Sequence, residues 1–515
     1  MHIPGHVAFE ARTPDGLTRA ARLLFWLALV AIVGLNLFNV GQPILEQHGF
    51  RQTQTALTAH YLQLEGFSLR YPTPVVGEPW SIPFEFPIYQ QIVATASSAL
   101  GTSLTATGRV INLIFVLLCC IPLRCGLRRL KVDQAAIDFS LALFLSSPIY
   151  LFWAGTFMIE GAALCFTLAF LYYALKVFQR DVSNRDFVFL GLFLGLALLQ
   201  KITTVAAVLA LFGLAAGYLV LVRRQATPTP GFVIKLAVSV LIPVILGVAW
   251  VKFSDAVKLD NPIGALLTSA KLSAWNYGTL EQRLSGDFWG KVVFNRNIKK
   301  AAFNVIGLLF VIGAFFMVRD RIARRVIAAG MVLFLLPFLL FTNLHAIHNY
   351  YQTANSVFLS VAVGVAVIYV LRERQWGRRA MGVGVLVAFI ASNAVFFHNN
   401  YFELKAMRFT GAERTLAVAS YVKAHTPADR PVIWYGFDWS SEAAFYSGRR
   451  SLTVPDWDRL ELDVLENPGR FLRSAPSAIV LCPTPRHDAE LARGIAERYP
   501  QARTAVVADC RIHLL

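Results

Sequence analysis

Charged residues are scarce in this chain of 515 residues: they make up 15% of it, whereas hydrophobic residues make up 56%. The mean hydropathy is correspondingly high, at +0.54. So few charges exclude the series of soluble domains that a chain of this length would otherwise form. A bilayer span needs about 20 mostly apolar residues, and such runs recur until about residue 397. We therefore predict a polytopic membrane protein.

Several motifs are also missing, and their absence narrows the function. No glycine-rich phosphate loop follows a predicted strand, and no internal repeat of the kind found in transporters occurs. No CxxC pair or other metal-ligand spacing is found. Four cysteines lie in or beside apolar runs: Cys119, Cys120, Cys125 and Cys165. Cys482 and Cys510 lie on predicted strands of a region expected in an oxidising compartment, and the sequence leaves open whether they pair.

The apolar runs predict an all-α membrane domain of about eleven transmembrane helices. Their approximate bounds are 23–40, 110–123, 139–153, 159–175, 187–199, 205–221, 232–251, 302–318, 326–341, 357–371 and 381–397. Lys and Arg gather in every second connection, which places those connections in the cytoplasm. The net charge of +17 therefore mostly reflects the orientation of the chain in the membrane. A nucleic-acid-binding protein would be expected to carry a basic soluble domain, and this sequence does not predict one.

This topology divides the chain into three parts in a bacterial inner membrane. Residues 1–22 form a cytoplasmic arm, residues 23–400 the transmembrane domain, and residues 401–515 a small periplasmic α/β domain. Two long loops lie outside, at 42–109 and 252–300. Alternating segments predict the α/β domain: helices near 412–425, 459–472 and 488–498, and strands near 432–435, 478–481 and 505–514.

The first outer loop concentrates polar groups beside the membrane. On a helix, His48, Arg51 and Gln52 share a face with Thr55. An Arg fork matches phosphate geometry, and an imidazole or carboxylate is able to take a proton. The alternative is an interfacial amphipathic helix. Glu85 stands alone between aromatic residues, where it needs either a function or a salt bridge to Arg51 or Arg70.

Other polar residues are expected on the same side of the membrane. Glu160, early in the fourth span, is an ionisable group within the bilayer and hence a candidate for substrate binding. Lys201, at a hairpin tip, either holds a phosphate or extends to the interface. His345 and His348 favour hydrogen bonding over metal binding, because no carboxylate or HxxxH spacing completes a metal site.

Together these residues resemble the GT-C fold of integral-membrane glycosyltransferases. The likeness is greatest to the protein O-mannosyltransferases and lipid A aminoarabinose transferases, the glycosyltransferase family 39-like group, and covers about residues 20–400. It rests on the run from His48 to Thr55, the run Glu85-Phe-Pro-Ile-Tyr, Glu160, Lys201 and the run His348-Asn-Tyr-Tyr. The family usually opens this loop with an acidic pair whose Asp is the base. Here His48 stands three residues before Arg51, so Glu46, His48 and Glu85 all stay open as the base.

The resemblance implies transfer of a sugar from a polyprenyl-phosphate carrier to an envelope lipid, glycan or protein, with inversion. The donor phosphate would contact Arg51, Lys201, Arg283, His345, His348 and Tyr350, and further substrate contacts would come from Gln52, Glu160 and Tyr351. No cofactor is predicted, and no divalent metal is indicated. The alternatives are a polymerase or ligase of the O-antigen type, and a transporter or flippase of lipid-linked substrates.

Overall fold

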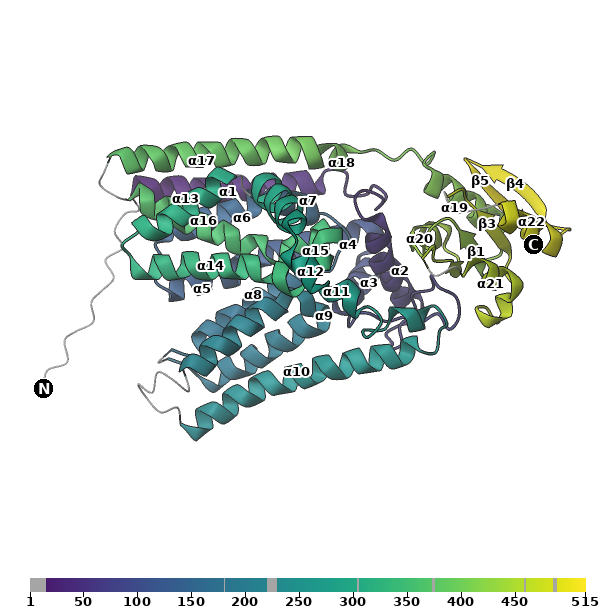
Figure 1. Ribbon diagram of the computed structural model, residues 1–515, viewed down its shortest axis with the longest axis horizontal. Helices are drawn as coiled ribbons and strands as arrows, with labels where there is room; N and C mark the ends of the chain where they lie inside the picture. The colour runs from purple at the N-terminus through teal and green to yellow at the C-terminus, as the bar shows by residue number, and fades with distance from the viewer. Residues whose placement is uncertain are drawn as a thin grey trace, which may run out of the picture.

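The computed structural model describes residues 15–179, 181–219, 229–302, 305–372, 376–457, 460–484 and 489–515. Most of the arm expected at 1–22 therefore lies outside the described residues. Figure 1 shows a helical bundle with the C-terminal α/β domain at one end of it. Within the described part, six helices are long and apolar enough to cross a membrane, and three shorter helices are apolar as well. The chain is a multi-pass membrane protein.

Each expected span falls on one or more helices. These are α1 (Gly16–Leu37), α4 (Leu104–Leu118), α5 (Cys120–Arg129), α6 (Gln134–Ser146), α7 (Pro148–Trp153), α8 (Glu160–Lys176), α9 (Asn184–Gly217), α10 (Pro230–Lys258), α13 (Val305–Met317), α14 (Arg321–Leu340), α16 (Ser356–Leu371) and α17 (Trp376–Phe397). Polar caps start several of them: the side chain of Asp133 accepts from the backbone of α6, and that of Asp320 from α14. The number of membrane crossings stays a prediction.

The helix α9 reverses direction at Lys201, whose backbone leaves helical geometry (φ −167°, ψ 99°). Ring contacts reveal the reversal. Phe187, before Lys201, packs on Phe232, and Phe212, after it, packs on Phe178, which itself contacts Phe232. The segments before and after Lys201 therefore run back alongside each other. Lys201 lies at the tip of this hairpin, as predicted.

The two long loops contain short helices of their own. The first carries α2 (Gly49–Glu65) and α3 (Ile88–Leu100), and the second carries η2 (Gly264–Leu267), α11 (Ser273–Tyr277), α12 (Leu280–Leu284) and η3 (Phe288–Ala302). Two more, α15 (Thr342–Ile347) and η4 (Asn349–Ala354), follow α14. The segments η5 (His398–Phe402) and α18 (Glu403–Ala406) lead from α17 to the C-terminal domain.

The C-terminal domain is a five-stranded sheet in the order β2-β1-β3-β5-β4, with β1 parallel to β2 and β3. Its strands are β1 (Val432–Tyr435), β2 (Ser451–Thr453), β3 (Ala478–Leu481), β4 (Arg503–Val507) and β5 (Cys510–Leu514). Its helices are α19 (Arg414–His425), α20 (Glu442–Ser447), α21 (Glu461–Glu466), η6 (Pro468–Arg470) and α22 (Ala489–Arg498). The single strand predicted at 505–514 was wrong: a turn with Ala508 at φ 52° makes it an antiparallel hairpin. Residues 459 and 488, where two helices were predicted to begin, lie outside the described residues.

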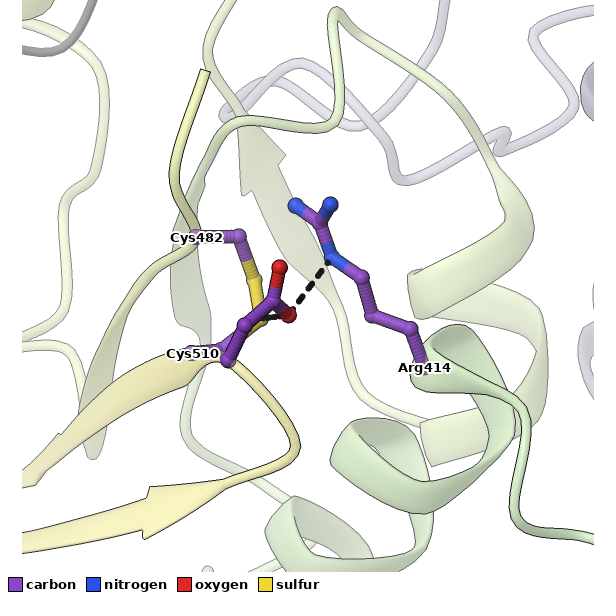
Figure 2. Close-up of a disulfide and its surroundings, with 4 residues drawn as sticks. Arg414, Cys482 and Cys510 are labelled. Atoms are coloured by element: carbon purple, nitrogen blue, oxygen red, sulfur yellow. Dashed lines mark hydrogen bonds and ion pairs between the residues drawn. A yellow bond between two sulfur atoms is a disulfide. The ribbon is translucent and has the colours of Figure 1, made fainter.

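A disulfide joins Cys482, just after β3, to Cys510 at the start of β5, with Cα atoms 4.2 Å apart. Figure 2 shows the bond with Arg414 beside it. Arg414 forms an ion pair with Asp509 at 3.3 Å. The bond ties the parallel half of the sheet to its antiparallel half. The pairing that the sequence left open is therefore made.

The first outer loop adds to the edge of this sheet. Val76 pairs antiparallel with Leu452 of β2. The backbone of Thr453 donates to Val75 at 2.8 Å, and that of Gly77 donates to Ser451 at 3.1 Å. Side chains from α2, the loop and the sheet then share one apolar core. The last domain and the first loop are thus one folded unit, which fixes the segment leading to Glu85.

Candidate active site

Arg51 and Glu85 form a buried ion pair at the centre of the first outer loop. One Arg51 nitrogen lies 3.0 and 3.1 Å from the two Glu85 oxygens, and both side chains are nearly enclosed. The Gln90 amide donates to the same carboxylate at 2.9 Å, and the Tyr71 hydroxyl donates to the Glu85 backbone at 2.7 Å. Burial opposes ionisation of Glu85, but the Arg51 charge outweighs it and lowers the pKa of Glu85. Glu85 is therefore a fixed anion that orients Arg51.

A second ion pair joins Lys201, at the tip of α9, to Glu160 in the first turn of α8. The Lys201 ammonium lies 2.5 Å from Glu160 Oε1, and the side chains are 10% and 4% exposed. It also lies over two rings, 4.1 Å from the centre of Tyr351 and 5.0 Å from that of Tyr350. The other oxygen of Glu160 is buried without a hydrogen-bond partner among the described residues.

His48 lies between these pairs, just before α2. Its ring packs 5.1 Å from Tyr350 and 5.3 Å from His348, and Nε2 lies 3.1 Å from the Asn349 side-chain oxygen. Because that oxygen only accepts, Nε2 carries the proton and Nδ1 keeps its lone pair. Burial lowers the pKa of His48, although Asn349 and Glu160 oppose the shift. The imidazole is thus neutral at pH 7 and able to accept a proton.

The two histidines after α14 are neutral as well. Burial lowers the pKa of both His345 and His348 to about 3, and the neighbouring Lys201 adds to each shift. Their Nδ1 atoms are buried without a hydrogen-bond partner among the described residues. In that part of the chain, no group of three or more His, Cys, Asp or Glu side chains is placed to hold a metal ion.

These groups form one assembly, which we call the polar cluster: His48, Arg51, Glu85, Glu160, Lys201, His348, Tyr350 and Tyr351. Backbone contacts hold its two halves together, because Phe86 donates to Leu199 at 3.0 Å and Tyr89 donates to the Gln200 side chain at 3.1 Å. The cluster combines two cations, two anions, two neutral imidazoles and buried polar atoms without partners. Buried polar atoms without partners in a native fold need an explanation, such as a catalytic role or a bound ion.

Solved structures of membrane glycosyltransferases superpose on this chain. ArnT from Cupriavidus metallidurans, solved with undecaprenyl phosphate bound, superposes with a TM-score of 0.62 at 16% identity, over 96% of this chain and 98% of that one. The archaeal oligosaccharyltransferase AglB from Archaeoglobus fulgidus, in complex with an inhibitory peptide and a dolichol-phosphate, gives 0.57 at 9% identity, over 91% and 70%. The chain has the GT-C fold of membrane glycosyltransferases.

Two further comparisons agree with the GT-C fold. The arabinofuranosyltransferase AftD from Mycobacteria gives a TM-score of 0.57 at 14% identity, over 96% of this chain and 40% of that one. Residues 87–250 match a family model described as dolichyl-phosphate-mannose-protein mannosyltransferase. No curated relative matches the chain in sequence.

Three of the predicted site residues lie in other contacts within this GT-C fold. Glu46 pairs with Arg109 at 2.8 Å, and both side chains are enclosed. The Gln52 amide bridges backbone groups, donating to Gln47 and accepting from Phe157. Arg283 donates to the backbone oxygens of Tyr277 at 2.6 Å and Leu339 at 2.9 Å. All three are occupied in holding the scaffold.

The sequence reasoning missed two arginines near the cluster. Arg109, where the first long loop is predicted to end, is the buried partner of Glu46 and also donates to the Gly155 backbone at 2.9 Å. Arg296, in η3, donates to the backbone of Ala346 at 2.6 Å and so fixes the segment before His348. The sequence contains one indication that Arg109 is buried in a contact: a charged residue inside a helix that borders the membrane needs a partner.

An apolar cavity lies beside α9, the helix that carries Lys201. It has a volume of about 610 Å³ and lies between the first arm of α9 and α10. Its lining runs from Asn184 and Lys235 at one end to Leu199 and Leu246 at the other. Leu199 is two residues before Lys201, and its backbone oxygen accepts from Phe86, the residue after Glu85, so one end of the lining is linked to the segments that carry the cluster.

Proposed function

We propose that this protein transfers a sugar from a polyprenyl-phosphate carrier to a hydroxyl of a cell-envelope acceptor. The observation that carries the proposal is the polar cluster and the apolar cavity linked to it. A lipid-linked sugar donor has the same sequence of chemistry: a long apolar chain, then a phosphate, then a sugar. The likeness to ArnT and AglB, each solved with a polyprenyl phosphate, supports this donor class.

Arg51 and Lys201 are the proposed phosphate ligands. A guanidinium matches two phosphate oxygens, and a lysine supplies a compact positive charge. Glu85 and Glu160 hold these cations in place, and Tyr350 and Tyr351 shield Lys201 from water. His345 and His348 are neutral, and their Nδ1 atoms have no hydrogen-bond partner among the described residues. They are the remaining polar groups proposed to line the phosphate site.

His48 is the proposed base. The Glu46 carboxylate is enclosed in an ion pair with Arg109, and Arg51 lowers the pKa of Glu85, which makes Glu85 a weak proton acceptor. His48 Nδ1 takes the proton of the acceptor hydroxyl as its oxygen bonds to the anomeric carbon. The bond from that carbon to the phosphate oxygen breaks, and the electron pair leaves with the polyprenyl phosphate. One displacement of this kind inverts the anomeric centre.

The prenyl chain is proposed to lie in the cavity between α9 and α10. The lining is apolar apart from Asn184, Lys235 and Ser239, and it includes Pro243 of α10. The outward orientation of the cluster is supported by the Cys482–Cys510 disulfide, since such bonds persist in oxidising compartments. The basic inner connections support the same orientation. We therefore propose a bacterial inner-membrane enzyme with a cytoplasmic N-terminus and a periplasmic site.

A direct test uses the purified full chain and synthetic polyprenyl phosphates that carry different sugars. Incubated with envelope lipid extract, the protein should release free polyprenyl phosphate and label one acceptor class. Comparing lipids from cells with and without the protein would identify that acceptor. The proposal fails if no donor of this class is consumed and if undecaprenyl phosphate leaves the thermal melting of the protein unchanged.

A further inference from the structure

A second apolar cavity, with a volume of about 430 Å³, lies among the helices α5, α8, α9, α14 and α16. It shares no lining residue with the cavity between α9 and α10. Figure 1 shows α5 and α14 in the part of the bundle that lies away from the C-terminal domain. The lining is apolar apart from Tyr172 and Arg325. The cavity is therefore a separate feature, which the proposed function does not use.

This cavity follows one face of α14 for nearly the depth of one bilayer leaflet. Its lining residues on α14 are spaced three or four apart, or lie side by side, as one face of a helix requires: Ile322, Arg325, Val326, Ala329, Gly330 and Leu333. From Arg325 to Leu333 a helix rises about 12 Å, whereas half of the hydrocarbon core of a bilayer measures about 15 Å. The cavity is thus long enough for much of one acyl chain of one leaflet.

The end of the cavity that carries Arg325 lies away from the polar cluster. Leu130 and Ile322, which line this end, stand directly after α5 and in the first turn of α14. Both helix ends adjoin basic connections. On the second arm of α9, the lining begins at Val208, about 10 Å of helix beyond Lys201. A ligand with its head on Arg325 therefore does not reach the candidate active site.

Arg325 differs from the cations on the adjoining helix ends in having no acidic partner. Arg129 pairs with Asp181 at 3.1 Å, and Lys176 pairs with Asp186 at 2.5 Å. Arg325 is exposed, and within the described part of the chain no carboxylate lies at ion-pair distance from it. A guanidinium matches the geometry of a phosphate group. The cavity thus joins an apolar channel to a free phosphate-binding cation.

We infer that this cavity binds an acidic phospholipid, with one acyl chain between the helices and the headgroup phosphate on Arg325. Apolar walls alone accept the chain of any membrane lipid. The guanidinium favours an anionic headgroup, because a zwitterionic lipid brings its own cation beside the phosphate. Basic pockets between membrane helices bind anionic headgroups in this way. The inference goes beyond the proposed function and does not depend on it.

The test uses the purified full-length chain and phosphatidylglycerol that carries a photoreactive group in one acyl chain. Irradiation should label peptides within residues 168–178 and 322–333, which line the cavity. Phosphatidylcholine with the same chains should label them about fivefold less, the contribution of one cation to binding an anionic headgroup. An excess of inorganic phosphate should leave the labelling unchanged, because burial of the acyl chain supplies most of the affinity.

Two pairs of variants separate the headgroup contact from the chain contact. Arg325→Gln should lower labelling by phosphatidylglycerol about fivefold, to the level of phosphatidylcholine. Its control is Arg321→Gln, an exposed arginine one turn earlier that does not line the cavity. Ala329→Phe places a ring in the cavity and should abolish labelling by both lipids. Its control is Val332→Phe, at an exposed position of the same helix outside the lining. Both controls should label as the wild type does.

Three results would overturn the inference: equal labelling of the wild type by the two lipids, equal losses in Arg325→Gln and Arg321→Gln, or labelling confined to other peptides. Displacement of phosphatidylglycerol by undecaprenyl phosphate would also overturn it, because the cavity would then hold the donor lipid. Failure of sugar transfer would count against the proposed function alone, since the labelling needs neither donor nor acceptor.

Discussion

Helix α8 and the first arm of α9 carry an acid–lysine pair at each of their ends, and the two pairs differ in what surrounds them. Lys176 and Asp186 meet at 2.5 Å, as Lys201 and Glu160 do. The second oxygen of Asp186 accepts from the backbone and hydroxyl of Ser183, closing a capping box. The second oxygen of Glu160 has no hydrogen-bond partner among the described residues.

This difference shows how the same pair of residue types serves two purposes. At the Lys176 end, every oxygen of the acid is used to start a helix and join it to its neighbour. At the Lys201 end, the backbone is non-helical and aromatic rings exclude water. We interpret the first pair as part of the scaffold and the second as part of a ligand site.

The largest expected effect belongs to the imidazole beside the Lys201–Glu160 pair. His48→Asn should lower kcat about 10³-fold, the usual contribution of a general base. His60→Asn, a histidine further along the same helix, is the matched control and should change kcat little. In the wild type, kcat/KM should fall on the acid side only below the ordinary histidine value of 6.5, because burial lowers the pKa of His48. A His48→Asn variant with normal turnover would remove the histidine from the mechanism.

The next largest effect is expected when Lys201 is compared directly with Lys176. Lys201→Gln should lower kcat/KM for a polyprenyl-phosphate sugar about 10²-fold, because one charge that stabilises the leaving phosphate is lost. Lys176→Gln, at the other end of α8, should leave this ratio within about twofold. Steady-state kinetics of both purified variants would measure the contrast. Equal losses in the two would show that both pairs act through the fold.

Asp186 should show the opposite behaviour, with a loss of stability and no loss of catalysis. Asp186→Ala removes a helix cap, which costs about 1 to 2 kcal/mol in free energy of unfolding. Thermal melting in detergent would measure this, and kcat per folded molecule should stay at the wild-type value. A Glu160→Gln variant should instead melt near the wild-type temperature and lose turnover. The comparison between the pairs breaks down if the two variants behave alike.

The smallest expected effect is a gradual decrease in the free energy of unfolding as the pH falls. The pKa of His345 is about 3 in the folded chain and 6.5 ordinarily. Between these values the unfolded chain binds a proton that the folded chain does not. Stability should therefore be full above pH 6.5 and fall by about 1 kcal/mol for each pH unit below it. His345→Phe should flatten this slope, whereas the exposed His425→Phe should not; melting curves from pH 7 to 5 would show the difference.

Local patterns predicted much of the fold and part of the site. Apolar runs of bilayer length have few alternatives to helices, so each expected span falls on one or more helical segments. Glu85 was expected to need a partner, with Arg51 and Arg70 as candidates. The structure pairs it with Arg51, while Arg70 pairs with Asp260 at 3.0 Å.

The rest of the site depends on contacts between distant segments. Glu46 looked like a free base beside the membrane, but its partner, Arg109, is 63 positions away. Spacing along a helix brings together only residues three or four apart, so such a pair is invisible to it. The same holds for Arg296, which contacts the segment before His348. The packing of the whole bundle determines which carboxylate is buried beside a cation and which stays free to act as a base.

The pairing of Val76 with Leu452 also sets the order in which the protein matures. The first outer loop is synthesised early, yet the strand that orders it is 376 positions later in the chain. At about 5 to 20 residues per second, the loop waits on the order of 20 to 75 s for its partner strand. A nascent chain released before that point would be inserted but inactive. We therefore expect the proposed activity to require completion of the C-terminal domain.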